Sequence, residues 1–217
     1  MFMKKIKAFI NFVYLLIKNP GRRLNISLIF GIFVNLIYLG GNFLSAVVYR
    51  SPWAISVIAY HVIFLLMRLY LVYSGRNSPS ERKPDSICLF IGVLLFVLDF
   101  LALAIIMLTI SDIGRVRYSG FLLFFFLCYA IYSLASSLLG MKKWKNDNNI
   151  LHFTAKNLSF ASALMSVFNL QFSVFSSLNV DSALGERLIY LGGFSVFVLI
   201  LALSFRLIVK GRSTFTR

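Results

Sequence analysis

The fold is decided by residues 151–178, LHFTAKNLSFASALMSVFNLQFSVFSSL. This stretch is long enough to cross a bilayer as a helix and carries no charge between Lys156 and Asp181. Its hydroxyl and amide side chains recur every three or four residues, so they fall within an arc of the helix about 100° wide. Because such an arc is unfavourable against lipid, we expect it to face the interior of a helical bundle. The arc consists of Ser159, Ser162, Ser166, Asn169, Ser173 and Ser176.

The composition is that of an integral membrane protein. Of the 217 residues, 59% are hydrophobic, and the mean hydropathy is +0.86. Soluble domains are about 45–50% apolar, so this chain does not fit a soluble fold. The length suits one bundle and leaves no room for a separate soluble domain. We therefore expect residues 20–217 to form a single all-α integral membrane domain.

Six apolar segments predict six transmembrane helices. They cover about 24–48, 53–73, 87–110, 118–139, 151–178 and 188–209. Residues 1–19 differ, because their apolar run from Ala8 to Ile17 is about half the length that spans a bilayer. Lysines flank this run, and Asn19-Pro20-Gly21 ends it. We expect residues 1–19 to form an amphipathic helix lying in the membrane interface.

The charge distribution predicts the orientation in the membrane. The net charge is +15, from 22 Lys and Arg against 7 Asp and Glu. The basic residues lie between apolar segments, where they meet anionic lipid headgroups, so we expect no nucleic-acid binding. With a cytoplasmic N-terminus, every Lys and Arg except Arg50, Arg115, Arg117 and Arg187 lies on or near the cytoplasmic side. This asymmetry predicts a multi-pass protein of the cell membrane with both termini in the cytoplasm.

Two other predicted spans carry polar or small side chains at helical spacing. The polar set in residues 24–48 repeats at steps of four and three, and the small set in residues 118–139 gives that helix an edge for close packing. Trp53 opens the second span, where an interfacial aromatic belt is expected. The two sets are Gly31, Asn35, Tyr38, Asn42 and Ser45, and Ala130, Ser133, Ser137 and Gly140.

Asp99 lies near the centre of its predicted span, where a carboxylate costs about 2.5–3.5 kcal/mol on insertion scales. At 1.5 Å per residue, Asp99 and Arg68 lie about 18 and 22 Å below the outer ends of their spans. We expect a buried Arg68–Asp99 pair that gates a polar pathway, or Asp99 as a proton or cation site. The alternative has Arg68 reaching cytoplasmic headgroups and Asp99 bonded to a neighbouring helix. His61, on the same face as Arg68, is a candidate proton relay or a hydrogen-bonded structural histidine.

The polar arcs have two interpretations. Their amides and hydroxyls could line a solute pathway, or they could hold the helices together by close packing and interhelical hydrogen bonds. Gln171 falls opposite the serine arc, so that face also meets protein or the helix is irregular. The substrate-path candidates are Asn35, Asn42, His61, Arg68, Asp99, Ser162, Ser166, Asn169 and Ser173.

Enzyme motifs are incomplete in this sequence. Gly193-Phe194-Ser195 resembles part of the nucleophile motif of intramembrane serine proteases, but Val196 replaces the following glycine. No Cys/His metal spacing and no phosphate-binding loop is present, and Cys88 and Cys128 are placed at different depths. We expect no enzymatic activity, no metal, no cofactor and no disulfide.

Two family resemblances follow from these features. SALMSVFNLQ, residues 162–171, resembles the penultimate helix of small, poorly characterised six-span membrane proteins of Gram-positive bacteria. The size, span number and predicted termini are also similar to the substrate-binding subunits of energy-coupling-factor vitamin transporters. Those subunits carry an AxxxA docking motif in their first helix, and Gly31 and Asn35 stand in the corresponding region here. The second resemblance implies a membrane subunit of a transporter.

Three functions remain open from sequence, and the least favoured is a membrane-embedded enzyme, because the sequence offers no credible pair of nucleophile and base. The first is a small-solute transport protein or transporter membrane subunit with a polar interior. The second is a non-enzymatic scaffold, sensor or immunity-type protein whose arcs are packing surfaces. A protein partner subunit or a second copy of the chain is compatible with either. The first predicts a water-accessible cavity bordered by Asn35, Asn42, Ser162, Ser166 and Asn169, whereas the second predicts tight burial of these residues.

Overall fold

The computed structural model describes residues 20–50, 52–76, 84–112, 118–143, 149–177 and 182–213. This part of the chain forms six α-helices, each long and apolar enough to cross a membrane. The prediction of an all-helical bundle with six spans is therefore confirmed for the described residues. The predicted interfacial helix at 1–19 lies outside them. The helices are α2 (Pro20–Tyr49), α3 (Pro52–Arg76), α4 (Pro84–Asp112), α5 (Gly120–Lys143), α6 (Ile150–Ser177) and α7 (Ser182–Ser213).

The helix ends follow from local sequence. Three helices begin at a proline, which lacks the N–H that the first helical position would leave unpaired. At the start of α6, the Asn149 side-chain oxygen accepts hydrogen bonds from Leu151 N at 3.0 Å and His152 N at 3.4 Å. After α2, Arg50 adopts a left-handed conformation with φ of 51°, which ends that helix before Pro52 begins the next.

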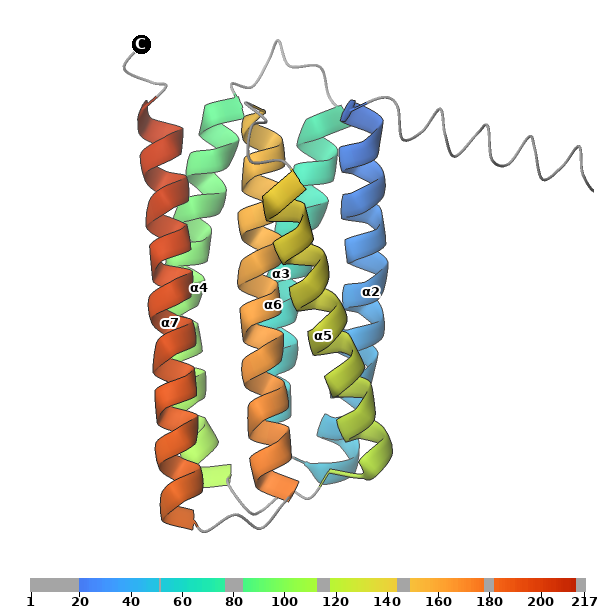
Figure 1. Ribbon diagram of the computed structural model, residues 1–217, viewed down its shortest axis with the longest axis vertical. Helices are drawn as coiled ribbons and strands as arrows, with labels where there is room; N and C mark the ends of the chain where they lie inside the picture. Colours follow the sequence, from blue (N-terminus) through green and yellow to red (C-terminus); the bar gives the residue numbers. More distant parts are fainter. Residues whose placement is uncertain are drawn as a thin grey trace, which may run out of the picture.

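The six helices run side by side along the long axis, and α6 lies in the middle of the bundle (Figure 1). It is the one helix that packs against all five others within the described chain. The most extensive pairings are α4 with α7, α5 with α6, and α2 with α3. Gly211 of α7 contributes to the α4–α7 pairing, because a Cβ at this position would lie 2.7 Å from the backbone nitrogen of Leu89.

The bundle has a hydrophobic core that contains a set of buried polar side chains, and its outer surface is apolar. In the most apolar window of α6, 61% of residues are buried, against 28–44% in the corresponding windows of the other helices. The outward faces carry large exposed apolar side chains such as Phe43, Phe121 and Leu191. Such an apolar surface suits contact with the acyl chains of lipids. The start of α2 and the end of α7 lie at the same end of the bundle (Figure 1). These features indicate a multi-pass membrane protein.

Candidate functional site

The polar arc of α6 faces the interior, as the periodicity predicts. Ser162, Ser166, Asn169, Ser173 and Ser176 are buried, and Ser159 is half-buried at the edge of the arc. The polar set of α2 is buried in the same way: Asn35, Tyr38, Asn42 and Ser45 are at most 2% exposed. We call these buried α2 and α6 side chains, with the α3 and α5 residues that contact them, the polar seam of the bundle.

Asn169 is the centre of a hydrogen-bond network in one half of the seam. Its side-chain oxygen accepts a bond from Trp53 Nε1 at 3.1 Å. Its amide nitrogen donates to the hydroxyl of Tyr38 and, at 3.3 Å, to Asn42 Oδ1. The Asn42 amide donates in turn to Tyr38 O at 3.0 Å. Side chains of α2, α3 and α6 thus satisfy one another in a region with no access to water.

The structure corrects the interpretation of Trp53 and decides between the two alternatives for Gln171. The assignment of Trp53 to an interfacial belt is wrong, because this side chain is fully buried and bonded to Asn169. Gln171 lies opposite the arc because that face of α6 also meets protein. Its amide donates to Leu188 O of α7 at 2.8 Å, and its side chain packs against Gly192.

Aromatic rings join this network to the other half of the seam. The Tyr38 ring stacks on Tyr129 of α5, with centroids 3.9 Å apart and an interplanar angle of 15°. The His61 ring packs edge-on against Tyr38 at 4.7 Å. Asn35 donates its amide to the backbone oxygen of His61 at 3.3 Å. The stacked tyrosines close the seam between its two halves.

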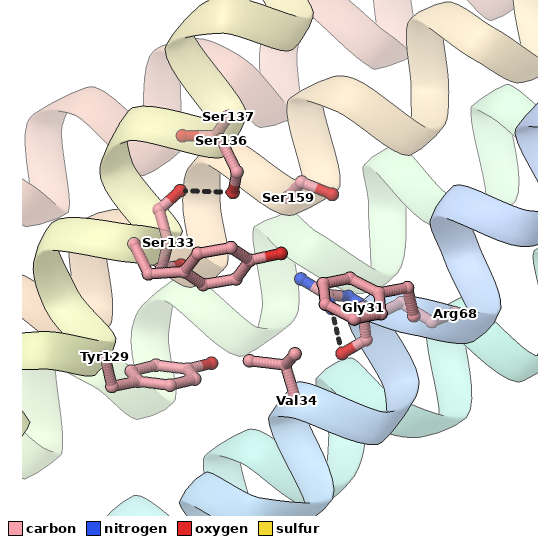
Figure 2. Close-up of a pocket in the computed structure, with 10 residues that line it drawn as sticks. Gly31, Val34, Arg68, Tyr129, Ser133, Ser136, Ser137 and Ser159 are labelled. Atoms are coloured by element: carbon pink, nitrogen blue, oxygen red, sulfur yellow. Dashed lines mark hydrogen bonds between the residues drawn. The ribbon is translucent and has the colours of Figure 1, made fainter. Parts of the chain in front are cut away.

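A pocket of about 100 Å³ opens on the other side of Tyr129, between α2, α3, α5 and α6 (Figure 2). Arg68 points into it and donates from Nη1 to the backbone oxygen of Gly31 at 2.7 Å. A Cβ on Gly31 would lie 2.6 Å from that nitrogen, so the glycine allows the close approach of the guanidinium. Six hydroxyl-bearing side chains complete most of the lining. The lining residues are Phe30, Gly31, Val34, Arg68, Tyr129, Tyr132, Ser133, Ser136, Ser137 and Ser159.

Arg68 is 6% exposed, and its Nε has no hydrogen-bond partner among the described residues. Serines of α5 line the same pocket as Arg68. Ser136 donates to Ser133 O at 3.1 Å, and Ser137 donates to Leu134 O at 2.9 Å, so both oxygens keep lone pairs available. The pocket thus combines one buried cation with neutral polar groups.

The predicted Arg68–Asp99 pair is not formed. Both carboxylate oxygens of Asp99 lack a partner within the described chain, although the residue is fully buried. Asp99 interacts electrostatically with Tyr60, which stands eight positions before Arg68 on α3 and therefore about 12 Å away along the axis. Arg68 instead faces Gly31 and the α5 tyrosines. The two charges lie at different depths of the bundle.

A direct His61–carboxylate relay is also not formed. Both ring nitrogens of His61 are buried without a hydrogen-bond partner in the described structure. The ring is surrounded by Tyr38, Tyr60 and Phe64. His61 therefore packs as part of an aromatic cluster rather than in contact with Asp99.

The five residues expected to border a water-accessible cavity are instead tightly buried, which is what the packing interpretation predicts, and the observed pocket is lined by other residues. Of the nine sequence candidates, Arg68 alone lines this pocket, and Asn35, Asn42, Ser162, Ser166 and Asn169 are at most 2% exposed. Ser166 and Ser173 donate to carbonyls of their own helix, Ala163 O at 2.7 Å and Asn169 O at 2.8 Å. Ser133 and Ser137 were recognised as a small edge of α5, and they line the pocket as well as pack. Tyr132, Ser136 and Ser159 were not predicted as its lining, although Ser159 belonged to the α6 arc.

The remaining reactive side chains lie apart from the pocket. Ser195 is exposed on α7 and donates to Leu191 O at 2.7 Å. Cys88 and Cys128 are free thiols, the first buried and the second exposed. The described residues contain no group of three or more His, Cys, Asp or Glu that could hold a metal ion.

The similarity to small six-span proteins and to vitamin-transporter subunits stays a prediction from the sequence. Comparisons with protein-family models, with curated proteins and with solved structures found no match to this chain.

Proposed function

We propose that this chain is a small-solute transport protein, or the membrane subunit of a transporter, and that it binds its solute in the Arg68 pocket. The observation that carries the proposal is a buried guanidinium with an unpartnered Nε, pointing into a pocket among membrane-spanning helices. An ionised side chain at membrane depth is costly unless it faces a partner, water or a ligand. The pocket provides the space for such a ligand.

The orientation predicted from charge places this pocket in the cytoplasmic half of the cell membrane. Arg68 lies eight residues before the end of α3 at Arg76, or about 12 Å along the axis from that end. α2 begins, and α5 and α7 end, at the same end of the bundle (Figure 1). The solute would therefore enter from the cytoplasmic side or from the adjoining leaflet.

The seam provides a route for a solute beyond the pocket. In this conformation the stack of Tyr38 on Tyr129 separates the pocket from the Asn169 network. Transport across the membrane requires this contact to open, because the residues beyond it are buried. The stack is accordingly the proposed gate between the two halves.

The test is solute flux in proteoliposomes containing the purified full-length chain, compared with Arg68→Gln and Arg206→Gln. Arg206 is exposed on α7, and its guanidinium lies 5.0 Å from the centroid of the Phe153 ring, so it controls for the loss of one positive charge. We expect a solute whose flux is lost in Arg68→Gln and retained in Arg206→Gln. Equal flux in all three proteins would contradict the proposal. So would the absence of both flux and binding across anionic, neutral and cationic solutes.

A non-enzymatic interaction protein is the second candidate. It is supported by Ser166 and Ser173, whose hydroxyls bond within α6 and leave the helix free to pack closely. Under this function a protein partner or a second copy of the chain would be recognised, and Arg68→Gln would leave every solute flux unchanged. Cross-linking of the chain in native membranes would then detect the partner.

A further inference from the structure

We propose that the Arg68 pocket binds an oxyanion, a carboxylate or phosphate head of a few atoms, with the guanidinium as its charge partner. This inference rests on the proposed function and names the chemical class of the solute.

The charge of the pocket favours an anionic ligand. Arg68 is the one residue with a formal charge among those that line the pocket. The buried carboxylate of Asp99 has no hydrogen-bond partner among the described residues and does not pair with Arg68. A buried cation without a counter-ion is strongly unfavourable, and an anionic ligand would supply the missing charge.

The N–H donors of Arg68 have a geometry that suits an oxyanion. Nη1 of Arg68 is already bound to Gly31 O, which holds the plane of the guanidinium in place. Nε is buried and has no hydrogen-bond partner among the described residues, so the guanidinium keeps an unsatisfied donor beside the pocket that an oxyanion could satisfy. Arginine presents its N–H groups as a planar fork that matches the two oxygens of a carboxylate or phosphate. Tyr132 and Ser133, both with hydroxyl groups, line the same pocket.

The size of the pocket restricts the ligand to a small group. The pocket measures about 100 Å³, whereas sites for drug-sized ligands measure about 300–1,000 Å³. The pocket is smaller than such sites, so it suits the head of a solute rather than a whole drug-sized molecule. A larger solute could place only its head here.

The outer wall of the pocket shows how a larger solute could be accommodated. Phe30 of α2 and Tyr132 of α5 are 52% and 42% exposed, and their rings meet edge to face at 6.1 Å. Both belong to the pocket lining, so two apolar rings separate it from the lipid-facing surface. The anionic head could therefore belong to a lipid in the adjoining leaflet or to a water-soluble anion.

The experiment measures binding to the full-length chain in neutral-lipid nanodiscs, from the ligand-induced rise in thermal unfolding temperature. The water-soluble probes are acetate and inorganic phosphate, and the lipid-borne probes are laurate and phosphatidic acid. Lauryl alcohol and phosphatidylcholine are the uncharged or zwitterionic controls. We expect at least one anion to bind, and its class identifies the source of the head. No saturable binding of any anion would overturn the inference.

Variants connect the binding to Arg68. Because hydrogen bonds to charged groups contribute strongly, we expect Arg68→Gln to weaken binding about ten- to a hundredfold. Gly31→Ala keeps the charge but displaces the guanidinium, since its Cβ would lie 2.6 Å from Nη1. Gly40→Ala, in the same helix with no atom within 4 Å of the added Cβ, is its matched control. Weaker binding in Gly31→Ala with unchanged binding in Gly40→Ala supports the site even if Arg68→Gln folds poorly.

The outcomes separate this inference from the proposed function. Anion binding that is unchanged in both Arg68→Gln and Gly31→Ala would overturn the inference. Flux of a neutral solute that depends on Arg68 would also overturn it, while the transport function would stand. Arg68-dependent anion binding without flux of any solute would support the site and contradict transport.

Discussion

The Asn169→Ala variant tests whether the hydrogen bonds of the polar seam stabilise the fold. Asn169→Ala removes three hydrogen bonds, to Trp53, Tyr38 and Asn42. Side-chain hydrogen bonds between membrane helices contribute about 0.6 kcal/mol on average and at most about 1.7. The three bonds together predict a loss of about 2 kcal/mol in the free energy of unfolding, with about 5 as the upper limit. The loss would be larger than for a serine of the same arc.

Ser166→Ala is the matched control. Ser166 is as deeply buried on the same helix, but its hydroxyl donates only to Ala163 O of that helix, so no interhelical bond is lost. Unfolding can be followed by titration with a denaturing detergent in mixed micelles, with the thiol reactivity of Cys88 as the reporter. This side chain is fully buried in the folded chain, and a Cys128→Ser background removes the exposed thiol.

A double-mutant cycle makes the test specific to one bond. Trp53→Phe removes the Nε1 donor and keeps most of the ring, so the Asn169–Trp53 coupling should be about 0.6–1.7 kcal/mol. If Asn169→Ala costs no more than Ser166→Ala, or if the coupling is zero, the network does not hold the helices together. The reasoning from buried polar spacing to bundle interior would then be refuted.

Three further outcomes are expected. Gly192→Ala should lower the free energy of unfolding by about 1 kcal/mol more in the native chain than in a Gln171→Ala background. The reason is that the added Cβ would lie 2.1 Å from the side-chain oxygen of Gln171. Equal losses of unfolding free energy in the two backgrounds, measured by detergent denaturation, would contradict this contact. Asp99→Leu should stabilise the fold by about 2–3 kcal/mol, since the buried carboxylate has no partner among the described residues; a destabilised variant would reveal a partner. In mild detergent at alkaline pH, a small maleimide should label Cys128 faster than Cys88, because only the first is exposed on the surface of the bundle; mass spectrometry that finds both thiols labelled at equal rates would contradict the packing of α4 on α7.

Most of the architecture follows from periodicity. The spacing of Ser162, Ser166, Asn169 and Ser173 predicted the buried face of α6, because polar groups at helical intervals avoid lipid whatever the neighbouring helix is. The same periodicity also predicts the buried face of α2. The helices extend beyond the predicted spans at most ends, since hydropathy marks the apolar part and not the caps.

The interaction partners of buried side chains are harder to predict from the sequence than the buried faces of the helices. Opposite charge and similar depth favour a pairing of Arg68 with Asp99, but whether it forms depends on how α3 and α4 are rotated and shifted against each other. One sequence contains no information on that rotation. Trp53 was misplaced for a related reason: its position near a helix start is compatible with either the interface or a partner such as Asn169.

The pocket itself could be predicted only in part. Arg68 was singled out because an arginine in an apolar span is rare. Tyr132 and Ser136 lie outside the small-residue edge of α5, so nothing in the spacing marked them. Their role depends on how α5 crosses α2 and α6, which is a property of the packed bundle (Figure 1).

The most direct test is cysteine accessibility along α6 in an otherwise cysteine-free chain. Ser159→Cys faces the pocket, whereas Ser166→Cys and Ser173→Cys replace fully or almost fully buried side chains. The account predicts that a small water-soluble thiol reagent modifies Ser159→Cys from the side of the membrane where α3 ends, that a bound anion slows this reaction, and that the other two positions stay unmodified. Equal modification at all three positions, or none at Ser159→Cys, would contradict the Arg68 pocket as a solute site.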